Sequence, residues 1–344
     1  GTVADVAPLI GVNRAFVRQG LKILSTRQRL GLQMLIDKSG LNSAPTSYHL
    51  GYILGPKLNA PGRIGPSDLA IKLLCSNSIS EATNLCEEIE ELNLKRKEIE
   101  NNVREEALEK VDENQAKNSI IWAAAEGWHP GVVGIVASRL KDKFNKPALV
   151  IGFDGIEGKG SGRSVDGYDL GFAIQRLQRE GLIQKGGGHK MAAGLSLKKD
   201  QLQTAMHRLC ELAEKDKIIT PEAQEVPVDG ILFIQAVNID LIEELENCGP
   251  FGSAIREPRF AFCDVSISFS KRVGDTHLKV RFSDDNGKSM DAICFRAFEG
   301  NLGAALAEHG GKKVHLVGKL DINYWQGKKS PQLIIDDAAW PEKL

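Results

Sequence analysis

The pattern of hydrophobic and polar positions is clearest in a stretch that begins at Ser78. Neither glycine nor proline occurs between Ser78 and Gly127. Apolar residues recur there at helical steps of three, four and seven among charged ones: Leu85, Ile89, Leu92, Ile99 and Val103. Ser78 and Glu81 form the S-x-x-E pattern that begins many helices. We predict one helix of roughly 35 to 40 residues, about 50 to 60 Å long. Its narrow apolar stripe fits a rigid strut between two domains, which we favour, or a coiled-coil helix.

The part of the chain before this helix has a mixed pattern. Residues 13–25 predict a helix with four apolar residues near one face: Phe16, Val17, Leu21 and Leu24. Residues 51–66 are so rich in glycine and proline that they predict a loop. The first residues, GTVADVAPLIG, read as though they lie inside an element. We therefore expect a buried strand–helix junction there and a chain cut from a longer polypeptide.

Residues 119–216 alternate between the strand and the helix pattern, which predicts an α/β domain. Strands are expected over 119–128, 147–154, 158–165 and 192–197, and helices over 131–144, 169–181 and 200–215. Residues 186–188, three successive glycines, are expected to form a loop that leads into the last of these strands. Residues 220–230 are polar and contain proline, and they predict a linker.

The remaining residues, from 226 to 344, predict a β domain. Five strand patterns occur, over 259–272, 276–284, 289–298, 313–323 and 331–340. Asn286-Gly287 predicts a hairpin between the second and third strands, and residues 301–310 predict a helix between the third and fourth. Five strands with a helix in this place are the order of an OB-fold barrel.

Composition limits the class of protein. With 344 residues, the chain is long enough for two or three domains, and its hydrophobic share of 42% and charged share of 26% are ordinary for a globular protein. No apolar run approaches the length that spans a bilayer, and no signal peptide is visible. The six cysteines lack metal-ligand spacing, which favours reduced thiols in a cytoplasmic protein. The net charge is −1, so nucleic-acid binding would require basic residues gathered locally.

The glycines at 186–188 offer two interpretations. Backbone N–H groups without side chains can bind a phosphate, and the adjacent His189 can add a hydrogen bond or a charge. Alternatively, the glycines form a tight turn into a strand that packs closely on its neighbour. Residues 126–134 (EGWHPGVVG) predict a second anion-facing turn, in which His129 either contacts an anion or only caps the helix.

Two arginines favour the phosphate interpretation. Ser161 and Arg163 lie two apart on a predicted strand, hence on one side of it, with Gly160 and Gly162 leaving room for a ligand. Arg63 lies in the predicted loop over 51–66. Arginine fits phosphate through its planar fork of donors, whereas a lone surface arginine is usually only solvated. Together these segments predict one anion pocket.

Six segments in order resemble the RecJ family, the single-strand-specific 5′→3′ DNA exonucleases of the DHH phosphoesterase superfamily. They are GTVADVAPL, NRAFVRQGL, GPKLNAPGRIG, EGWHPGVVGIVASRL, GSGRS and GGGHKMAAGLSL, and the resemblance covers nearly the whole chain. It implies an α/β protein with the C-terminal part of a DHH domain over 1–77, a connecting helix over 78–118, a DHHA1 substrate-binding domain over 119–218 and an OB-fold over 226–344.

The resemblance also implies roles for residues. Asp5, which by itself reads as a helix cap or a metal ligand, is similar to the last aspartate of a two-metal site for Mn²⁺ or Mg²⁺. Residues that would hold the 5′ phosphate or the scissile phosphate are Arg63, Ser161, Arg163 and His189, with the backbone at Gly187 and Gly188. His189 and Asp5 are the implied catalytic residues. The DHH-type motifs that supply most metal ligands do not occur in this sequence, so we expect this chain alone to bind single-stranded DNA without cleaving it.

The predicted OB-fold has its own candidate contacts. Residues 323–329 (NYWQGKK) join the last two strands and carry Trp325 and Lys328 on the loop that such barrels use for single strands. Four basic residues lie on the preceding strands: Lys271, Arg272, Lys279 and Arg281. The alternative is that Trp325 packs on the barrel and the lysines are only solvated.

Three functions are compatible with these features. The first is the C-terminal portion of a RecJ-like exonuclease acting in DNA repair and recombination on single strands with a 5′ phosphate. By resemblance, its partners would include a single-strand-binding protein and a helicase. The second is a non-catalytic nucleic-acid-binding module of a truncated relative. The third is a phosphoesterase for short oligonucleotides or cyclic dinucleotides, which the predicted OB-fold disfavours.

Overall fold

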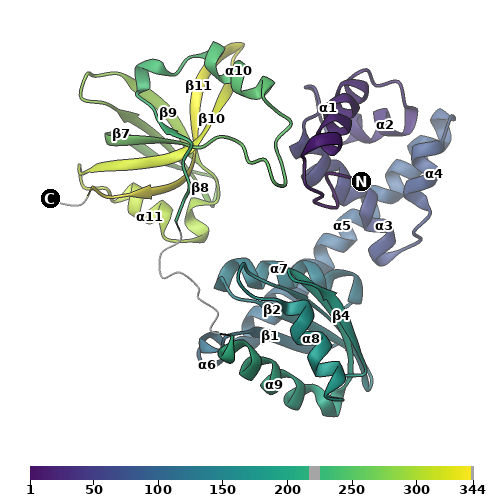
Figure 1. The fold of residues 1–344 in the computed structure, drawn as a ribbon. Helices are drawn as coiled ribbons and strands as arrows, with labels where there is room; N and C mark the ends of the chain where they lie inside the picture. Colours follow the sequence, from purple (N-terminus) through teal and green to yellow (C-terminus); the bar gives the residue numbers. More distant parts are fainter. Residues whose placement is uncertain (217–224, 342–344) are drawn as a thin grey trace. The chain divides into compact units, whose positions relative to one another are not determined.

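The computed structural model describes residues 1–216 and 225–341, and these residues form two compact units (Figure 1). One unit contains residues 24–45 and 49–222, and the other contains residues 1–23, 46–48 and 223–344. The predicted linker over 220–230 lies partly outside the described residues. In the part of the chain that is described, no helix is both long enough and apolar enough to cross a membrane.

The first unit begins with helices that pack on one long helix, α5 (Ile79–Lys110). The others are α2 (Leu30–Lys38), the π-helical segment η1 (His49–Leu54), α3 (Gly55–Ile64) and α4 (Leu69–Cys75). The prediction of a capped long helix is confirmed, because the Ser78 side chain accepts the Glu81 N–H. At 32 residues, α5 is somewhat shorter than predicted. It ends before Asp112, whose side chain caps the short α6 (Glu113–Lys117) instead.

The predicted loop over 51–66 is wrong, because these residues form η1 and α3. Pro56 occupies the first turn of α3, where proline costs no hydrogen bond, and only Pro61 lies in the interior. Two kinds of contact hold this helix in place. Leu54 and Ala60 are buried, and Lys57 forms an ion pair of 2.6 Å with Glu90 of α5.

The same unit continues as an α/β domain whose predicted elements are confirmed. Its strands are β1 (Ile121–Glu126), β2 (Ala148–Asp154), β3 (Glu157–Arg163), β4 (Lys185–His189) and β5 (Ala192–Lys198), in the sheet order β1-β2-β3-β5-β4. Its helices are α7 (Pro130–Phe144), α8 (Leu170–Arg179) and α9 (Leu202–Lys215), the last preceded by the 3-10 turn η2 (Lys199–Gln201). α8 and α9 bury one face of the sheet, and α7 with α5 buries β1 and β2 on the other.

The predicted glycine loop over 186–188 is wrong, since these residues form the edge strand β4. The glycines permit this strand rather than interrupt it. A side chain at Gly186 would collide with Ile174 and Ile183, and one at Gly188 would collide with the backbone of β5. Close packing on Ile174 and Ile183 explains Gly186, and close packing on β5 explains Gly188.

The second unit contains a closed barrel that confirms the OB-fold. Its strands are β7 (Phe260–Val273), β8 (His277–Ser283), β9 (Ser289–Cys294), β10 (Lys313–Trp325) and β11 (Lys328–Ala339). Pairing of β10 with β7 closes the barrel, and β11 runs parallel to β9. The predicted helix is α11 (Leu302–Ala307), and Gly287 has φ of 78° in the predicted Asn-Gly hairpin. The two-residue β6 (Gly230–Ile231) and the 3-10 turns η3 (Ile234–Ala236) and η4 (Ala297–Glu299) complete the domain.

Two helices of this unit meet at a loop of the barrel domain. α1 (Gly11–Ser25) confirms the helix predicted over 13–25, although Phe16 is 68% exposed rather than packed. α10 (Ile239–Asn247) was not predicted. Arg14 and Arg18 of α1 donate to the carbonyl groups of residues 247–249, where α10 ends. These bonds satisfy carbonyls that a helix C-terminus leaves without partners.

Candidate anion-binding site

Two arginines lie beside the first two turns of α7. His129 caps this helix, because its Nδ1 accepts the Gly131 N–H at 3.0 Å. Arg63, in the last turn of α3, donates from Nη1 to the Gly131 carbonyl at 3.0 Å. A side chain at Gly131 would overlap the Arg63 carbonyl, so the end of α3 packs directly on the start of α7. Arg63 is therefore fixed by a helix, not by the predicted loop, and His129 acts as the cap.

The second arginine lies on β3, one turn further along α7. A Cβ at Gly134 would lie 2.9 Å from Ser161 Oγ and 3.1 Å from Arg163 Nη2. Arg163 donates from Nη1 to Ser161 Oγ at 3.0 Å and to the Gly162 carbonyl at 2.9 Å. Ser161 and Arg163 thus share one side of β3, as predicted, and they face the turn of α7 that follows the one contacted by Arg63.

The electrostatics of the two guanidinium groups favour an anion between them. Burial lowers the pKa of Arg163, and the nearby charge of Arg63 lowers it further. Burial also lowers the pKa of Arg63, followed by repulsion from Arg96, whereas Glu100 partly offsets this. Arginine stays protonated at neutral pH despite such shifts. Two cations that repel each other, of which Arg163 is partly buried and Arg63 is exposed, are stabilised by a shared anion, and phosphate fits their planar forks.

His189 lies on the same face of the sheet as Arg163. In the register of the sheet, Arg163 pairs with Ala192 and Ala192 pairs with His189. Residues paired across antiparallel strands point to the same face. Two strand spacings separate the backbones of Arg163 and His189 by about 10 Å. The fold therefore brings the segments of Arg63, Ser161 and Arg163 together, and it places the exposed His189 on the same face of the sheet; that these residues bind an anion stays a prediction.

The glycines beside Arg163 do not have the predicted role. Side chains at Gly160 and Gly162 would point to the opposite face and collide with core leucines and Ile151. These glycines make room for the core, not for a ligand. The sequence alone missed this because period-two alternation assigns the two glycines to one face but does not say that it is the buried one.

Asp5 does not lie where we expected it. It is exposed in a turn over residues 2–6, where its N–H donates to the Gly1 carbonyl at 2.8 Å, and no strand–helix junction forms there. It also belongs to a different compact unit from the arginines. Among residues 1–216 and 225–341, no group of three or more His, Cys, Asp or Glu side chains could hold a metal ion. The described residues therefore do not by themselves fit a two-metal centre.

The predicted loop over 323–329 is mostly strand. Trp325 ends β10 and Lys328 begins β11, and the two are paired across a turn of two residues. Gln326 and Gly327 both have positive φ, of 48° and 76°, as a tight hairpin turn requires. Trp325 is 69% exposed and does not pack on the barrel.

Basic side chains lie on one face of β7 and β8, and β9 adds the acidic Asp291, which lies 3.8 Å from Lys279. Lys271 pairs with Lys279, and Phe269 pairs with Arg281 in the next row. Arg281 donates to Asp291 at 2.6 Å, so its charge is largely compensated. The 47%-exposed ring of Phe269 was missed by sequence reasoning, because a bulge between Ile267 and Phe269 reverses the alternation of β7. Arg272 lies instead over the Phe298 ring.

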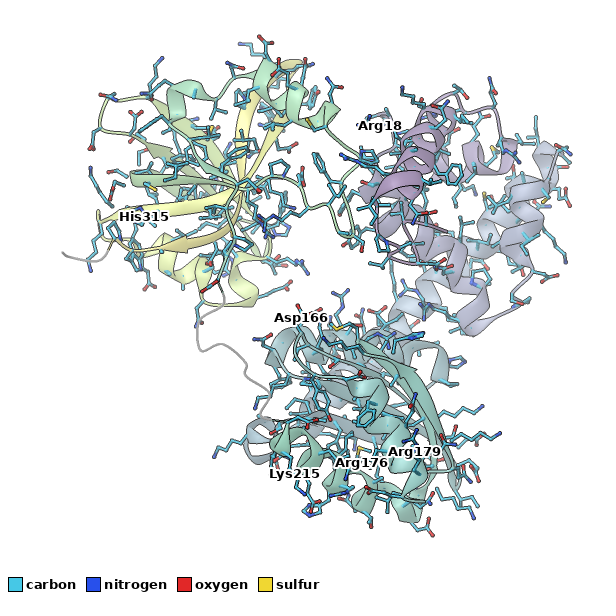
Figure 2. All side chains as sticks on the ribbon, in the orientation of Figure 1. Arg18, Asp166, Arg176, Arg179, Lys215 and His315 are labelled. Carbon is cyan, nitrogen blue, oxygen red and sulfur yellow. The ribbon has the colours of Figure 1, made fainter. Side chains whose placement is uncertain are left out.

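Side chains on the outer surface of the α/β domain provide a contrast with the candidate site. Arg176 and Arg179 lie along α8, and Lys215 ends α9 (Figure 2). Arg176 is paired with Glu180 at 3.0 Å. Arg163, in contrast, has no acidic partner among the described residues and donates to a hydroxyl and a carbonyl.

Comparison with known proteins supports this architecture. The DHHA1 domain model matches residues 117–215, and the RecJ OB domain model matches residues 228–337. The chain is 35% identical to the single-stranded-DNA-specific exonuclease RecJ of Bacillus subtilis, over 99% of this chain and 43% of the relative. It is 36% identical to that of Escherichia coli, over 99% of this chain and 60% of the relative. The chain thus spans about half the length of these relatives.

Solved structures agree with the sequence relatives. The crystal structure of RecJ from Thermus thermophilus in complex with Mn²⁺ matches with a TM-score of 0.84 at 27% identity, over 100% of this chain and 49% of that one. The same protein in complex with Mg²⁺ matches with a TM-score of 0.83 at 27% identity, over 99% of this chain and 51% of that one.

Proposed function

We propose that this chain, which carries the DHHA1 and RecJ OB domains and belongs to the RecJ family, is the C-terminal portion of a single-strand-specific 5′→3′ DNA exonuclease. Residues 1–77 would be the end of its DHH domain, 78–118 its connecting helix, 119–218 its DHHA1 domain and 226–344 its OB-fold. Its role would be to hold the end and the body of the strand, and a longer protein would carry out hydrolysis.

The observation that carries this proposal is the convergence of Arg63, Ser161 and Arg163 on the first two turns of α7. The two guanidinium groups neutralise the 5′ phosphate, and the Ser161 hydroxyl donates a hydrogen bond to it. His189 reaches the phosphate at the other side of the terminal nucleotide from the same sheet face, helped by the backbone at Gly187 and Gly188. Hydrogen bonds to charged phosphate oxygens are stronger than neutral ones, so the pocket favours a phosphorylated end.

The metal ions require a separate argument. RecJ structures contain Mn²⁺ or Mg²⁺, and such ions would stabilise the charge that develops on the scissile phosphate. We propose that Asp5 supplies one carboxylate ligand to that site. Because each ion needs several oxygen ligands, the described residues of this chain carry no step of the chemistry through the metal.

The OB-fold would bind the body of the strand. The exposed rings of Trp325 and Phe269 offer stacking surfaces, and Lys271, Lys279 and Lys328 offer charges for the backbone. This combination tolerates any base, which suits a nuclease that acts on single strands of any sequence.

The test compares 5′-phosphorylated with 5′-hydroxyl thymidine oligonucleotides in binding to the purified chain. Arg163→Ala should abolish the preference for the phosphorylated end, because half of the guanidinium charge at the pocket is lost. Arg163→Lys should restore the charge but not the paired donors. Arg179→Ala on α8 is the matched control and should behave as the native chain. An unchanged phosphate preference in Arg163→Ala would refute the proposal.

A further inference from the structure

The uncovered part of the sheet has a floor without side chains. In the register of β3, β5 and β4, Ser161 pairs with Gly194 and Gly194 pairs with Gly187. The neighbouring row contains Arg163, Ala192 and His189. We call Gly187 and Gly194, with the small Ala192 beside them, the glycine floor. It lies on the same face as Ser161, Arg163 and His189, because residues in paired rows point to one side.

Among the described residues, no packing contact requires glycine at either floor position. A Cβ at Gly187 would meet no atom within 4 Å, and one at Gly194 would meet only the Gly160 carbonyl, at 3.8 Å. Neither residue has a positive φ. Gly186 and Gly188, in contrast, are fixed by contacts with Ile174, Ile183 and β5. Glycine without a packing or backbone reason weakens a strand, so the open space above Gly187 and Gly194 requires another explanation.

The flanking groups indicate what would occupy this space. Arg163 with Ser161 lies at one end of the floor and His189 at the other, with backbones about 10 Å apart. Two phosphate-binding groups on one face at this separation can contact the phosphates on either side of one nucleotide, because both side chains are long enough to turn toward the space between their strands. The sugar and base between them would then lie over a surface that carries no side chain.

We propose that Gly187 and Gly194 are specificity-determining residues, whose missing side chains admit the sugar and base of the terminal nucleotide. This inference rests on the proposed function, because it requires a 5′ phosphate at Arg163. A nucleotide that lies against the sheet cannot remain stacked and paired in a duplex. The floor would therefore select an unpaired end, independently of the OB-fold.

The test uses two probes on the full chain, 5′-phosphorylated thymidine dinucleotide and inorganic phosphate, with affinities from calorimetry. Gly194→Val places a branched side chain on the floor, in a residue type that strands favour. We expect its affinity for the dinucleotide to fall about tenfold or more, as for an overfilled site, while its phosphate affinity is kept. Gly187→Ala adds a single methyl group in open space and should give a smaller loss of the same kind.

Ser196→Val is the matched control, because Ser196 lies two residues along β5 on the same face, outside the floor. It should bind both probes as the native chain does. Three results would each overturn the inference. Gly194→Val could bind the dinucleotide as tightly as the native chain does, or it could lose as much affinity for phosphate as for the dinucleotide. Ser196→Val could lose as much dinucleotide affinity as Gly194→Val. Arg163→Ala should lose both probes. If Arg163→Ala binds both probes as the native chain does, the proposed phosphate site itself is wrong. This result can be distinguished from the three outcomes that concern only the glycine floor.

Discussion

Trp325 is the residue whose surroundings most clearly suggest a binding role rather than a packing one. Its ring is exposed at the end of β10, next to Lys328 in the register of the hairpin. The adjacent Tyr324 ring is already contacted by Lys329, whose Nζ lies 5.6 Å from the ring centre and also pairs with Glu243 at 3.1 Å. Trp325 thus has a free aromatic face on a hairpin held firmly by its neighbours.

Replacement of Trp325 by alanine should weaken the binding of single-stranded DNA. Stacking of one base on an aromatic ring contributes about 1 to 3 kcal/mol, so the dissociation constant should rise roughly 5- to 150-fold. Fluorescence anisotropy with a labelled thymidine oligomer measures this change. Phe172→Ala, which removes another exposed ring from α8 of the other unit, should leave the affinity unchanged. Equal losses in both variants would argue against specific stacking.

Sequence and structure agree at some residues and differ at others for a physical reason. Alternation along β3 correctly placed Ser161 and Arg163 on one side. It could not decide which glycines face the core, because Gly160 and Gly194 look alike in a sequence and differ only in what packs above them. Resemblance to a family supplied the candidate site residues, and only the sheet register shows that His189 lies on the same face as Arg163.

A buried charged cluster lies along α5, at the level of the site. Arg96 is 7% exposed and donates to Glu100 at 2.5 Å and to Asn93 at 3.1 Å. Arg139 of α7 lies 3.9 Å from the other Glu100 oxygen. Glu100 therefore provides a negative charge between α5 and α7, and its field also favours the charged form of Arg63.

Removal of the Glu100 carboxylate should destabilise the protein strongly. Glu100→Ala leaves the Arg96 charge buried without its partner, which typically costs about 3 to 5 kcal/mol in the free energy of unfolding. The double variant Arg96→Met/Glu100→Leu removes both charges, and it should recover most of this loss. Urea denaturation of the three proteins measures the difference. If the double variant is as unstable as Glu100→Ala, packing rather than charge is responsible.

A second ionic network, on the surface, links α8 to α9. Glu180 accepts from Arg176 and from Arg208, and these hydrogen bonds, those of Arg208 first, lower the pKa of Glu180 to about 2. A lowered pKa in the folded state adds stability above the unfolded value near 4.5, and this stability is lost as the pH falls toward 2.

This network predicts a pH dependence. The melting temperature of the native chain should fall between pH 4.5 and pH 2 partly because Glu180 becomes protonated. Glu180→Gln should melt lower than the native chain at pH 7, and the two curves should approach each other toward pH 2. Calorimetry at several pH values measures this. A constant difference across the range would show that the carboxylate charge has no part in it.

At the scale of elements, the sequence pattern predicted the helices and strands that depend on local sequence. It failed for segments whose secondary structure is determined by tertiary packing. The capped helix α5, the strands of the barrel and the Asn286-Gly287 hairpin follow from capping, alternation and turn chemistry. Residues 51–66 have the composition of a loop and yet form a helix, because α5 covers them and Lys57 pairs with Glu90. Residues 186–188 form a strand because β5 offers a partner.

For the whole molecule, the central question is how binding and hydrolysis are divided. The chain spans 43% and 60% of the length of two relatives named as exonucleases. We propose that its arginines hold a phosphate and that its barrel holds the strand. In the described ranges, however, its acidic and histidine side chains form no group of three that could hold a metal ion. Mn²⁺ and Mg²⁺ ions prefer several oxygen ligands each, and Asp5 is a single exposed carboxylate.

The purified chain should therefore bind single-stranded DNA without hydrolysing it. With Mn²⁺ and a 5′-phosphorylated, 3′-labelled oligonucleotide, we expect no release of nucleotides above the level without metal, although anisotropy shows the DNA bound. A metal titration shows whether the lack of hydrolysis comes from the lack of a bound metal ion. The electron paramagnetic resonance signal of free Mn²⁺ should persist at equimolar protein, because Asp5 alone cannot displace enough water from the ion. Metal-dependent shortening of the DNA from its 5′ end would contradict this division, since the chain would then have to assemble a metal centre from residues that lie apart in its described structure.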